Sequence, residues 1–200
     1  TQGYGGGLYA ATNVQWTCSS CTLEDNTAQF SGGAVYTLSA KVSFTKNTVI
    51  RSNEAKTGDG GGLYWASRVN LSVSHTSFQS NRALQEDQGR GGAIAFQYPV
   101  DFSLSNVLLQ SNEANYGGGV YSPEGTPSFI VNNTLVDSNK AAVSGGGFYS
   151  NASSSFKVYD SVFRNNEAAT TQLVEDGDGV GGGGVYIGSS SSSSSPSPAE

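Results

Sequence analysis

The 200-residue sequence lacks the features on which several classes of function depend. It has only ten Lys and Arg residues and a formal net charge of -6, so it lacks the basic surface that nucleic-acid phosphates require. It has no apolar run long enough to cross a membrane as a helix and no recognisable signal peptide. Because it also has no methionine, we expect the chain to be a processed product or a piece of a longer protein, and the missing signal says nothing about secretion.

Cysteine and histidine are scarce, which limits metal and redox chemistry. The two cysteines form one Cys18-Ser-Ser-Cys21 sequence, which supplies at most two of the four ligands of a structural zinc site. A thioredoxin-like redox motif would lie beside a βαβ pattern, and none is present. We therefore expect Cys18 and Cys21 to form a local disulfide or to be two ordinary thiols, and we predict no metal and no cofactor.

What the sequence does contain is a repeat. One frame, an apolar residue followed three positions later by Asn and five later by Ala, occurs six times. Its asparagines are Asn26, Asn53, Asn81, Asn112, Asn139 and Asn166. Their spacings are 27, 28, 31, 27 and 27 residues, which is the fixed period of a solenoid protein.

A second landmark recurs in the same period. Seven glycine clusters lead to an apolar residue and usually to Tyr, as in Gly60-Gly-Gly-Leu-Tyr64. Between this cluster and the Asn lies a segment that alternates with period two, such as Phe102-Ser-Leu104, and that alternation is typical of a strand. In the second unit the segment Val42-Ser-Phe44 is displaced by one residue, which a β-bulge could absorb.

These landmarks predict an all-β protein, a right-handed single-stranded parallel β-helix with about 27 residues per coil and six to seven coils. Each coil would have three short strands: the glycine cluster to Tyr, the alternating segment, and the apolar-x-x-Asn-x-Ala piece. We place this domain at residues 1–188 and a Ser/Pro-rich disordered linker or stalk at residues 189–200, because such a tract cannot bury enough apolar surface to fold. The alternative is a leucine-rich repeat, but its return segment would run through glycine clusters that are poor helix formers.

The pairing of a Gly-Gly-Ala-[Ile/Leu/Val] motif with a Phe-x-x-Asn motif resembles the polymorphic outer-membrane protein repeat. The best examples are Gly91-Gly-Ala-Ile94 and Phe163-Arg-Asn-Asn166, and the resemblance covers residues 5 to about 187. This family includes bacterial surface adhesins and repeat domains of secreted algal and protist proteins, so the resemblance implies a β-helix exposed outside the cell. No C-terminal membrane barrel follows in this sequence, and the Ser/Pro tract is similar to the spacers of algal wall glycoproteins.

Stacked coils turn equivalent positions into rows, and two rows have a predicted structural role. The six asparagines would form a ladder in which amides pair from coil to coil. The residue after each Asn alternates in charge from the second unit onward, which predicts a row of ion pairs that fixes the register. These residues are Thr27, Glu54, Arg82, Glu113, Lys140 and Glu167.

A third row consists of the tyrosines that end the glycine motif. They are Tyr9, Tyr36, Tyr64, Tyr121, Tyr149 and Tyr186, with Ala95 interrupting the row. Alternation places them on the outer face, where they would either bind sugar rings or a partner surface, or simply stack on one another and stiffen the sheet.

The sequence does not favour an enzyme. Cleavage of a glycosidic bond needs two carboxylates about 5 to 10 Å apart, whereas Asp101, Asp137 and Asp160 lie eleven, two and six residues before their Asn and so scatter around the coil. The single histidine, His75, shares its offset from the Asn with Asn106, Asn133 and Asp160, which indicates a polar corner row more than a catalytic base.

Two insertions and three sequons complete the candidate sites. The connections around Leu84 to Arg90 and Thr170 to Gly181 are longer than the others and fall at one corner, where repeat proteins often carry binding loops. The second contains Glu175-Asp-Gly-Asp178, which lacks the other ligands of a calcium loop. Acceptor sequences for N-glycosylation, usable only in a secreted chain, begin at Asn70, Asn132 and Asn151.

From the sequence we expect a non-enzymatic extracellular β-helix module, structural or adhesive, in a cell surface, matrix or surface-filament glycoprotein. The expected partners are other copies or neighbouring coils, because a coil at the end of a rod has open strand edges, and glycans. Nucleic acid and direct membrane insertion are not expected. The alternatives are a carbohydrate-active β-helix enzyme similar to pectate lyases and a carbohydrate-binding module that uses the tyrosine row.

Overall fold

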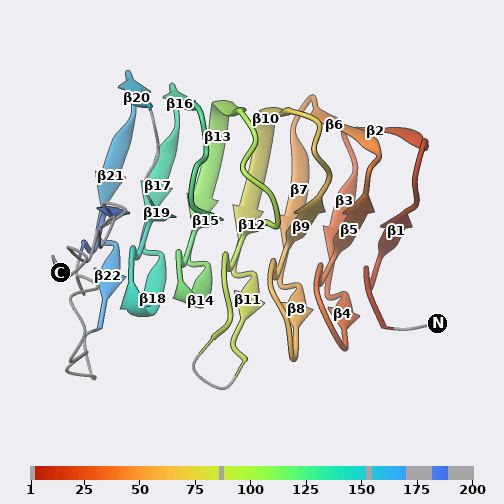
Figure 1. Cartoon of the computed structure of the whole chain (residues 1–200), viewed down its shortest axis with the longest axis horizontal. Helices are drawn as coiled ribbons and strands as arrows, with labels where there is room; N and C mark the ends of the chain where they lie inside the picture. Colours follow the sequence, from red (N-terminus) through yellow and green to blue (C-terminus); the bar gives the residue numbers. More distant parts are fainter. Residues whose placement is uncertain (1–2, 86–87, 152–154, 170–181, 189–200) are drawn as a thin grey trace, which may run out of the picture.

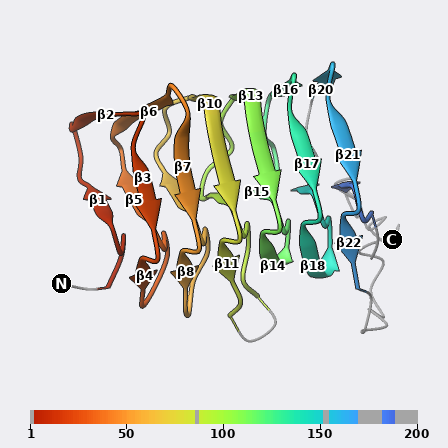
Figure 2. The same cartoon turned by 180° about the vertical axis from the view of Figure 1, so that it is seen from behind.

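The chain winds into a stack of parallel coils in the computed structural model, which describes residues 3–85, 88–151, 155–169 and 182–188. Figures 1 and 2 show the coils following one another along the longest axis. The regular elements of these ranges are all strands, so no helix in them could cross a membrane. The predicted all-β parallel β-helix, with about 27 residues in each of about six coils, is confirmed. The insertion at 170–181 and the Ser/Pro tract at 189–200 lie outside the described residues.

Three parallel sheets run along the stack, and each coil contributes to all of them. The first sheet contains β1 (Leu8–Ala10), β5 (Val35–Leu38), β9 (Leu63–Ala66), β12 (Ile94–Phe96), β15 (Val120–Ser122), β19 (Phe148–Asn151) and β23 (Val185–Gly188). The second contains β2 (Gln15–Ser19), β3 (Thr22–Glu24), β6 (Lys41–Thr45), β7 (Thr48–Arg51), β10 (Leu71–Gln79), β13 (Phe102–Gln110), β16 (Phe129–Asn132), β17 (Leu135–Asp137), β20 (Phe156–Tyr159) and β21 (Val162–Arg164). The third contains β4 (Thr27–Ala28), β8 (Glu54–Ala55), β11 (Arg82–Ala83), β14 (Glu113–Tyr116), β18 (Lys140–Ser144) and β22 (Glu167–Ala168).

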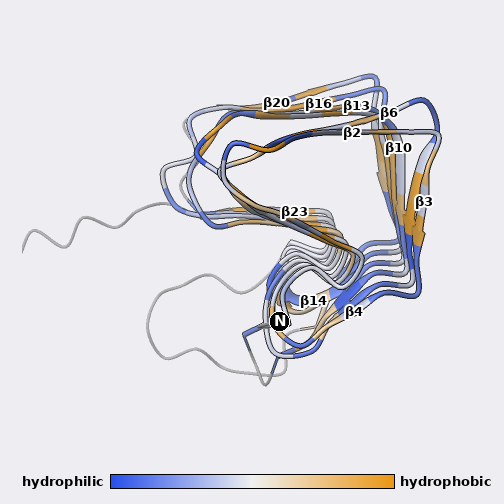
Figure 3. Ribbon diagram, turned by 90° about the vertical axis from the view of Figure 1, so that its right-hand side faces the viewer, coloured by the Kyte–Doolittle hydropathy of each residue, from blue (hydrophilic) through white to orange (hydrophobic). Residues whose placement is uncertain are grey.

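The strands of one coil differ from the predicted set in one respect. The apolar-x-x-Asn-x-Ala piece is not a single strand, because the chain turns at the Asn. Its first half extends the second sheet, as in the continuous strands β10 and β13, and the two residues after the Asn form the third sheet. In the end-on view of Figure 3 the successive coils lie nearly over one another with several sharp corners.

Three corners of the coil contain a residue in the left-handed region, and the position of that residue is the same from coil to coil. At the first corner it is the first glycine of the cluster, such as Gly60 with φ 69°. At the second it is the residue six before the Asn, such as His75 with φ 48°. At the third it is the residue one before the Asn, such as Ser111 with φ 54°. The ladder Asn that follows the third corner is not itself left-handed, and its side chain has a different role, described below.

The displaced second unit shows how the corners absorb an extra residue. Val42 and Phe44 still pair in register with Trp16 and Cys18, so no strand slips. The additional residue is taken up at the second corner, where both Lys46 and Asn47 have positive φ. The second sheet is interrupted at this corner between β6 and β7, as it is between β2 and β3 and between β16 and β17, whereas it is continuous in β10 and β13.

The interior is filled by rows of equivalent apolar side chains. The residue before each Tyr, the residue three before each Asn and the alternating residues of the second sheet are fully buried in the central coils, as Leu63, Phe78 and Leu104 show. In the outermost described coils the same positions are only partly buried, as at Leu23 and Phe163. Burial therefore depends on having a coil on both sides, as expected of a solenoid.

One edge of the coil is too narrow for any side chain larger than methyl. Ala55, Ala83 and Ala114 form a small separate cluster in the third sheet, and the second glycine of each cluster lies against the backbone of that sheet. A Cβ added to Gly33 would come within 2.1 Å of the carbonyl oxygen of Gly61 and 2.7 Å of the backbone nitrogen of Glu54. This close approach explains why Gly and Ala recur here in each unit.

The asparagine ladder crosses the interior beside this edge. The side-chain oxygen of Asn112 accepts hydrogen bonds from the backbone N–H and the side-chain amide of Asn81, both at 3.0 Å. Its own amide donates to the carbonyl of Phe78 at 3.0 Å and to the side-chain oxygen of Asn139 at 2.9 Å. The same pattern joins the asparagines from Asn26 to Asn166, so each amide closes the backbone of a corner.

Replacing one ladder residue should therefore cost more than one contact. We expect Asn112→Leu to lower the free energy of unfolding by about 1–3 kcal/mol or more. The change leaves a buried N–H, a carbonyl and two side-chain amide groups of neighbouring coils without their hydrogen-bond partner. Urea unfolding measures the loss, and Asn132→Leu, the same change at an exposed strand position, is the control. Equal losses in the two variants would contradict the ladder's structural role.

The narrow edge makes a second prediction. Gly33→Ala forces the backbones of two coils apart, so we expect it to destabilise by about 1–3 kcal/mol, as overpacking does. Gly184→Ala is the matched control, since an added Cβ there meets nothing within 4 Å. Thermal unfolding of both variants checks the prediction, and it fails if Gly33→Ala unfolds at the temperature of the unmodified chain.

Candidate functional site

The tyrosine row lies on the outer face of the first sheet. The parallel pairing sets Tyr9 beside Tyr36, Tyr36 beside Tyr64, and Tyr149 between Tyr121 and Tyr186. Neighbouring rings are stacked with centroids 4.9–5.3 Å apart and planes within 21° of parallel. Along most of the row each ring face is therefore turned toward the next ring.

This geometry favours the second of the two roles that the sequence left open, the stacking of the tyrosines on one another. A sugar ring stacks on the face of an aromatic ring, but here the faces are occupied by neighbouring tyrosines. Aromatic pairs of this kind stabilise by about 0.5–1.5 kcal/mol each beyond their buried area. Most of the row therefore joins coils together, and ring faces without a neighbouring ring of the row occur at the Ala95 interruption and at the two ends of the row.

At Ala95 the outer face of the first sheet lacks a tyrosine ring and has different neighbouring residues. The residue before each glycine cluster lies beside the tyrosine of the following coil, as Tyr4 does with Tyr36 at 4.8 Å and Tyr116 with Tyr149 at 5.4 Å. The residue in this position before Gly60 is Asp59, and the following coil presents Ala95 instead of a ring. The gap in the row is thus flanked by a carboxyl group.

Asp59 is enclosed by polar and aromatic groups of three coils. Its carboxylate accepts a hydrogen bond from the backbone N–H of Arg90 at 2.9 Å. Burial raises the pKa of Asp59 to about 6, against the lowering effect of the Arg90 charge and of that hydrogen bond. Burial and then the Asp59 charge raise the pKa of Tyr64, and the Asp59 charge also acts on buried Tyr121. A carboxyl group with a perturbed pKa in such surroundings is a functional-site candidate.

Two arginines lie on tyrosine rings beside the gap. The guanidinium carbon of Arg90 is 5.1 Å from the centroid of the Tyr121 ring, and Arg90 is supplied by the first of the two long connections. The guanidinium carbon of Arg68 is 4.1 Å from the centroid of the Tyr98 ring. Sequence reasoning missed Asp59, Arg68, Arg90 and Tyr98, because the residue types at these positions do not repeat from coil to coil. The length of the 84–90 connection and the interruption of the tyrosine row at Ala95 pointed to this region.

The charged rows on the third and second sheets pair between coils. In the row after each Asn, Arg82 contacts Glu113 at 3.5 Å and Lys140 contacts Glu167 at 3.4 Å. Glu54 pairs in register with Arg82. These side chains are about half exposed, so each pair contributes little, about 0–1 kcal/mol.

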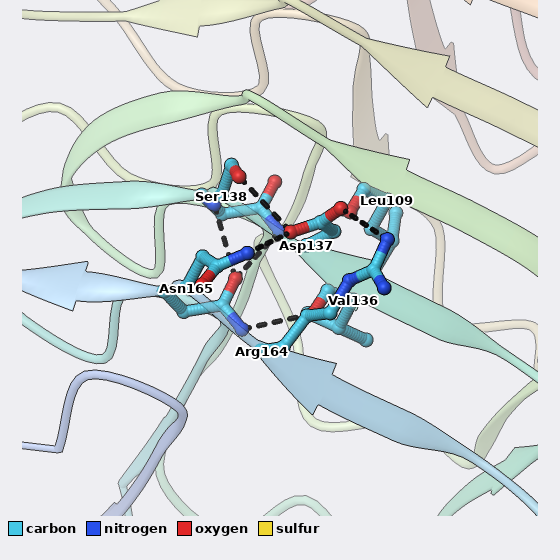
Figure 4. Close-up of polar contacts among 8 residues, drawn as sticks. Leu109, Val136, Asp137, Ser138, Arg164 and Asn165 are labelled. Carbon is cyan, nitrogen blue, oxygen red and sulfur yellow. Dashed lines mark hydrogen bonds and ion pairs between the residues drawn. The ribbon is translucent and has the colours of Figure 1, made fainter.

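A second charged row, two residues before each Asn, was not foreseen. It includes a Glu24–Arg51 ion pair and an Asp137–Arg164 pair at 3.0 Å. Figure 4 shows the carboxylate of Asp137 also receiving hydrogen bonds from Ser138 and Asn165. The hydrogen bond from Arg164 is the main cause of a lowered pKa of Asp137. This carboxylate is held by hydrogen bonds from Arg164, Asn165 and Ser138.

The other sequence candidates are distributed over separate faces. His75, Asn106 and Asn133 line a shallow groove of about 430 Å³ along the second corner, with Asp160 in the adjoining groove. Asp101 accepts a hydrogen bond from Asn70 at 3.4 Å. No three His, Cys, Asp or Glu residues within the described ranges come together as a metal site.

The remaining predicted positions do not belong to the rows and grooves described above. Cys18 and Cys21 are joined as a disulfide across the second corner of the first coil. The side chains of Asn70 and Asn132 are exposed and that of Asn151 is half-buried. The Glu175-Asp-Gly-Asp178 sequence lies outside the described residues.

Comparison with known proteins identifies the fold family. The profile of the right-handed β-helix region family matches residues 6–196. No curated protein matches the chain significantly, and no solved structure does so.

The raised pKa of Asp59 predicts a pH-dependent stability with a defined sign. Because the folded chain holds this proton up to about pH 6 and the unfolded chain loses it near the ordinary value, the free energy of unfolding should fall as the pH rises from about 4 to 6, by about 2–3 kcal/mol. Asp59→Asn keeps an oxygen for the Arg90 N–H and should remove this component. Urea unfolding of both chains between pH 4 and 8 tests it, and parallel pH curves would contradict it.

Proposed function

This chain belongs to the right-handed β-helix family, which includes structural proteins and carbohydrate-active enzymes, and from that premise we propose that it is a non-enzymatic extracellular module. In this proposal it is a rod with an adhesive surface in a cell coat, matrix or surface filament, resembling the polymorphic outer-membrane protein repeats. Its partners are other copies or neighbouring coils of the same assembly, and glycans.

The observation that carries the proposal is how the repeated polar and aromatic side chains are used. The asparagines bind one another inside the stack, the tyrosines stack on the outside, and the charged rows form ion pairs between coils. Nearly everything that repeats therefore joins one coil to the next. A chain built in this way is suited to carrying load or presenting a surface.

The extracellular part of the proposal is supported by chemistry that a secreted chain can use. The Cys18–Cys21 disulfide is typical of oxidising compartments. Exposed sequons at Asn70 and Asn132 could be glycosylated in such a compartment, and the Ser/Pro tract at 189–200 is typical of a stalk.

The alternative is a carbohydrate-active enzyme, and Asp59 is the residue that supports this alternative. Burial raises its pKa to about 6, a value suited to a general acid. A second carboxylate at the separation that glycoside hydrolysis needs has not been assigned among the described residues.

The decisive experiment measures binding and cleavage together. Beads coated with the purified chain are exposed to neutral, carboxylated and sulfated polysaccharides, and the size distribution of each polymer is followed by chromatography. We expect the coated beads to retain at least one polymer, or to retain added chain that is not coupled to a bead. We expect the length of each polymer to be unchanged after long incubation. Shortening that disappears in the Asp59→Asn variant would overturn the proposal in favour of the enzyme.

A further inference from the structure

Eight of the ten tyrosines gather in two clusters of four, which we name the tyrosine quartets. Each quartet contains three stacked rings of the tyrosine row and one ring from the position before a glycine cluster. The first quartet is Tyr4, Tyr9, Tyr36 and Tyr64, and the second is Tyr116, Tyr121, Tyr149 and Tyr186. The two remaining tyrosines are Tyr98 and Tyr159.

One ring at the centre of each quartet contacts the other three. Tyr36 is stacked between Tyr9 and Tyr64, and Tyr4 is tilted against it with centroids 4.8 Å apart. Tyr149 is stacked in the same way in the second quartet, and Tyr116 meets it edge-on at 5.4 Å. Within the described ranges every contact between two tyrosine rings therefore involves Tyr36 or Tyr149.

The stacked rings are placed for a covalent bond between neighbouring coils. Tyr9 and Tyr36 occupy paired positions of parallel strands, with ring centroids 5.3 Å apart and ring planes 3° from parallel. Tyr121 and Tyr149 have the same centroid separation and planes 7° from parallel. Equivalent carbon atoms of two such rings lie opposite each other, so rotation about the side-chain torsions can bring together the carbons next to the two hydroxyl groups.

The rest of the chain offers an oxidant few competing side chains. Thiols and methionine are common targets of oxidation in proteins, but this sequence has no methionine and its two cysteines are joined as a disulfide. Trp65 is buried and Trp16 is partly buried. Tyr4 and Tyr9, in contrast, are exposed, so a reagent in solution reaches the phenol groups of the first quartet directly.

We propose that the tyrosine quartets are sites of oxidative phenol coupling, at which a one-electron oxidant formed from hydrogen peroxide joins neighbouring coils through dityrosine. The expected bonds link Tyr36 or Tyr149 to a ring that contacts it. This inference goes beyond the proposed function, because it requires only the stacked rings and a peroxide.

The coupling reaction balances without any group supplied by the protein other than the two phenols. Each phenol loses one electron and its hydroxyl proton, and the two phenoxyl radicals join by a bond between the carbons ortho to their oxygens. The hydrogens on those two carbons then leave as protons, and the two oxygens take up protons to restore the phenols. The two electrons and two protons that are removed reduce one hydrogen peroxide to two waters.

Ala95 limits how far such bonds extend along the rod. Tyr64 and Tyr121 lie in the strands on either side of β12, which carries Ala95. They are therefore two strand separations apart, about 9.6 Å, and their rings are not in contact. The proposal thus expects bonds within each quartet and none between the two quartets.

The test oxidises the whole folded chain with hydrogen peroxide and a haem peroxidase at high dilution, which favours reaction within a chain. Dityrosine fluorescence is measured in the monomer band of a denaturing gel, and mass spectrometry measures the loss of two hydrogen atoms per bond. Cleavage at acidic residues such as Glu24 and Asp25 separates Tyr9 from Tyr36 and so identifies the linked positions. A bond between coils also constrains the unfolded chain as a disulfide does, so the thermal midpoint should rise after oxidation.

The variant Tyr36→Phe/Tyr149→Phe removes the central phenol of each quartet and keeps a ring for stacking. We expect it to lose the intrachain dityrosine and the rise in thermal midpoint. Tyr98→Phe/Tyr159→Phe is the matched control, because it removes two phenols that lie outside the quartets, and we expect it to react like the unmodified chain. Equal thermal midpoints before oxidation establish that the variants fold.

Intrachain bonds that map to contacting rings of the quartets, remain in the control and disappear in Tyr36→Phe/Tyr149→Phe support the proposal. Equal dityrosine in both double variants overturns it, as does dityrosine found only between chains or only at Tyr98 and Tyr159. Oxidation that modifies tryptophan and forms no dityrosine also overturns it. The linkage map of the unmodified chain decides the matter even if a variant fails to fold, and none of these results bears on whether the chain binds or cleaves a polysaccharide.

Discussion

The separation between neighbouring strands is the constraint on which the rest of this structure depends. Parallel coils that pair in register place each residue about 4.8 Å from its equivalents in the coils above and below. A side chain at such a position must therefore tolerate a copy of itself as its nearest neighbour. Asparagine does so because its amide is both donor and acceptor, and tyrosine does so because its rings stack. Like charges do not, which explains the alternation of sign in the row from Glu54 to Glu167.

The same constraint determines how the corners are built. A coil closes only if the chain turns within a residue or two while the strands on either side stay in register, and three corners of the coil do so with a left-handed residue. Small or polar residues such as Ser111 and His75 accept that conformation at modest cost, and the first glycine of the cluster accepts it without strain. The second glycine has a different reason, because a Cβ there would meet the backbone of the third sheet. The asparagine that follows the third corner then supplies its amide to the backbone groups that the turn leaves unpaired.

Because the rows are periodic, most of the architecture can be predicted from the sequence alone. Counting offsets from each Asn was sufficient to identify the buried rows, the outward tyrosines and the alternating charges. It does not identify the left-handed residue beside Asn112, because a repeated Asn is compatible both with a left-handed turn and with an amide ladder; in the structure Ser111 is left-handed and Asn112 belongs to the ladder. It also missed the pair of Asp137 with Arg164, since the row between Glu24 and Arg164 is interrupted by the neutral Gln79 and Gln110.

Residues outside the repeat could not be predicted in this way, and the candidate site consists of them. A seventh tyrosine at position 95 would add two more ring stacks, each of about 0.5–1.5 kcal/mol, yet the chain has alanine there and a half-buried carboxyl group beside it. The insertion that delivers Arg90 precedes β12, and the connection that carries Tyr98 follows the same strand. Elsewhere in the row the repeated side chains stabilise the contact between coils, but at position 95 the stacking ring is absent. Such local departures from the rules of stability are typical of functional sites. The interruption of the row, more than the row itself, is therefore where we expect this protein to meet its partner.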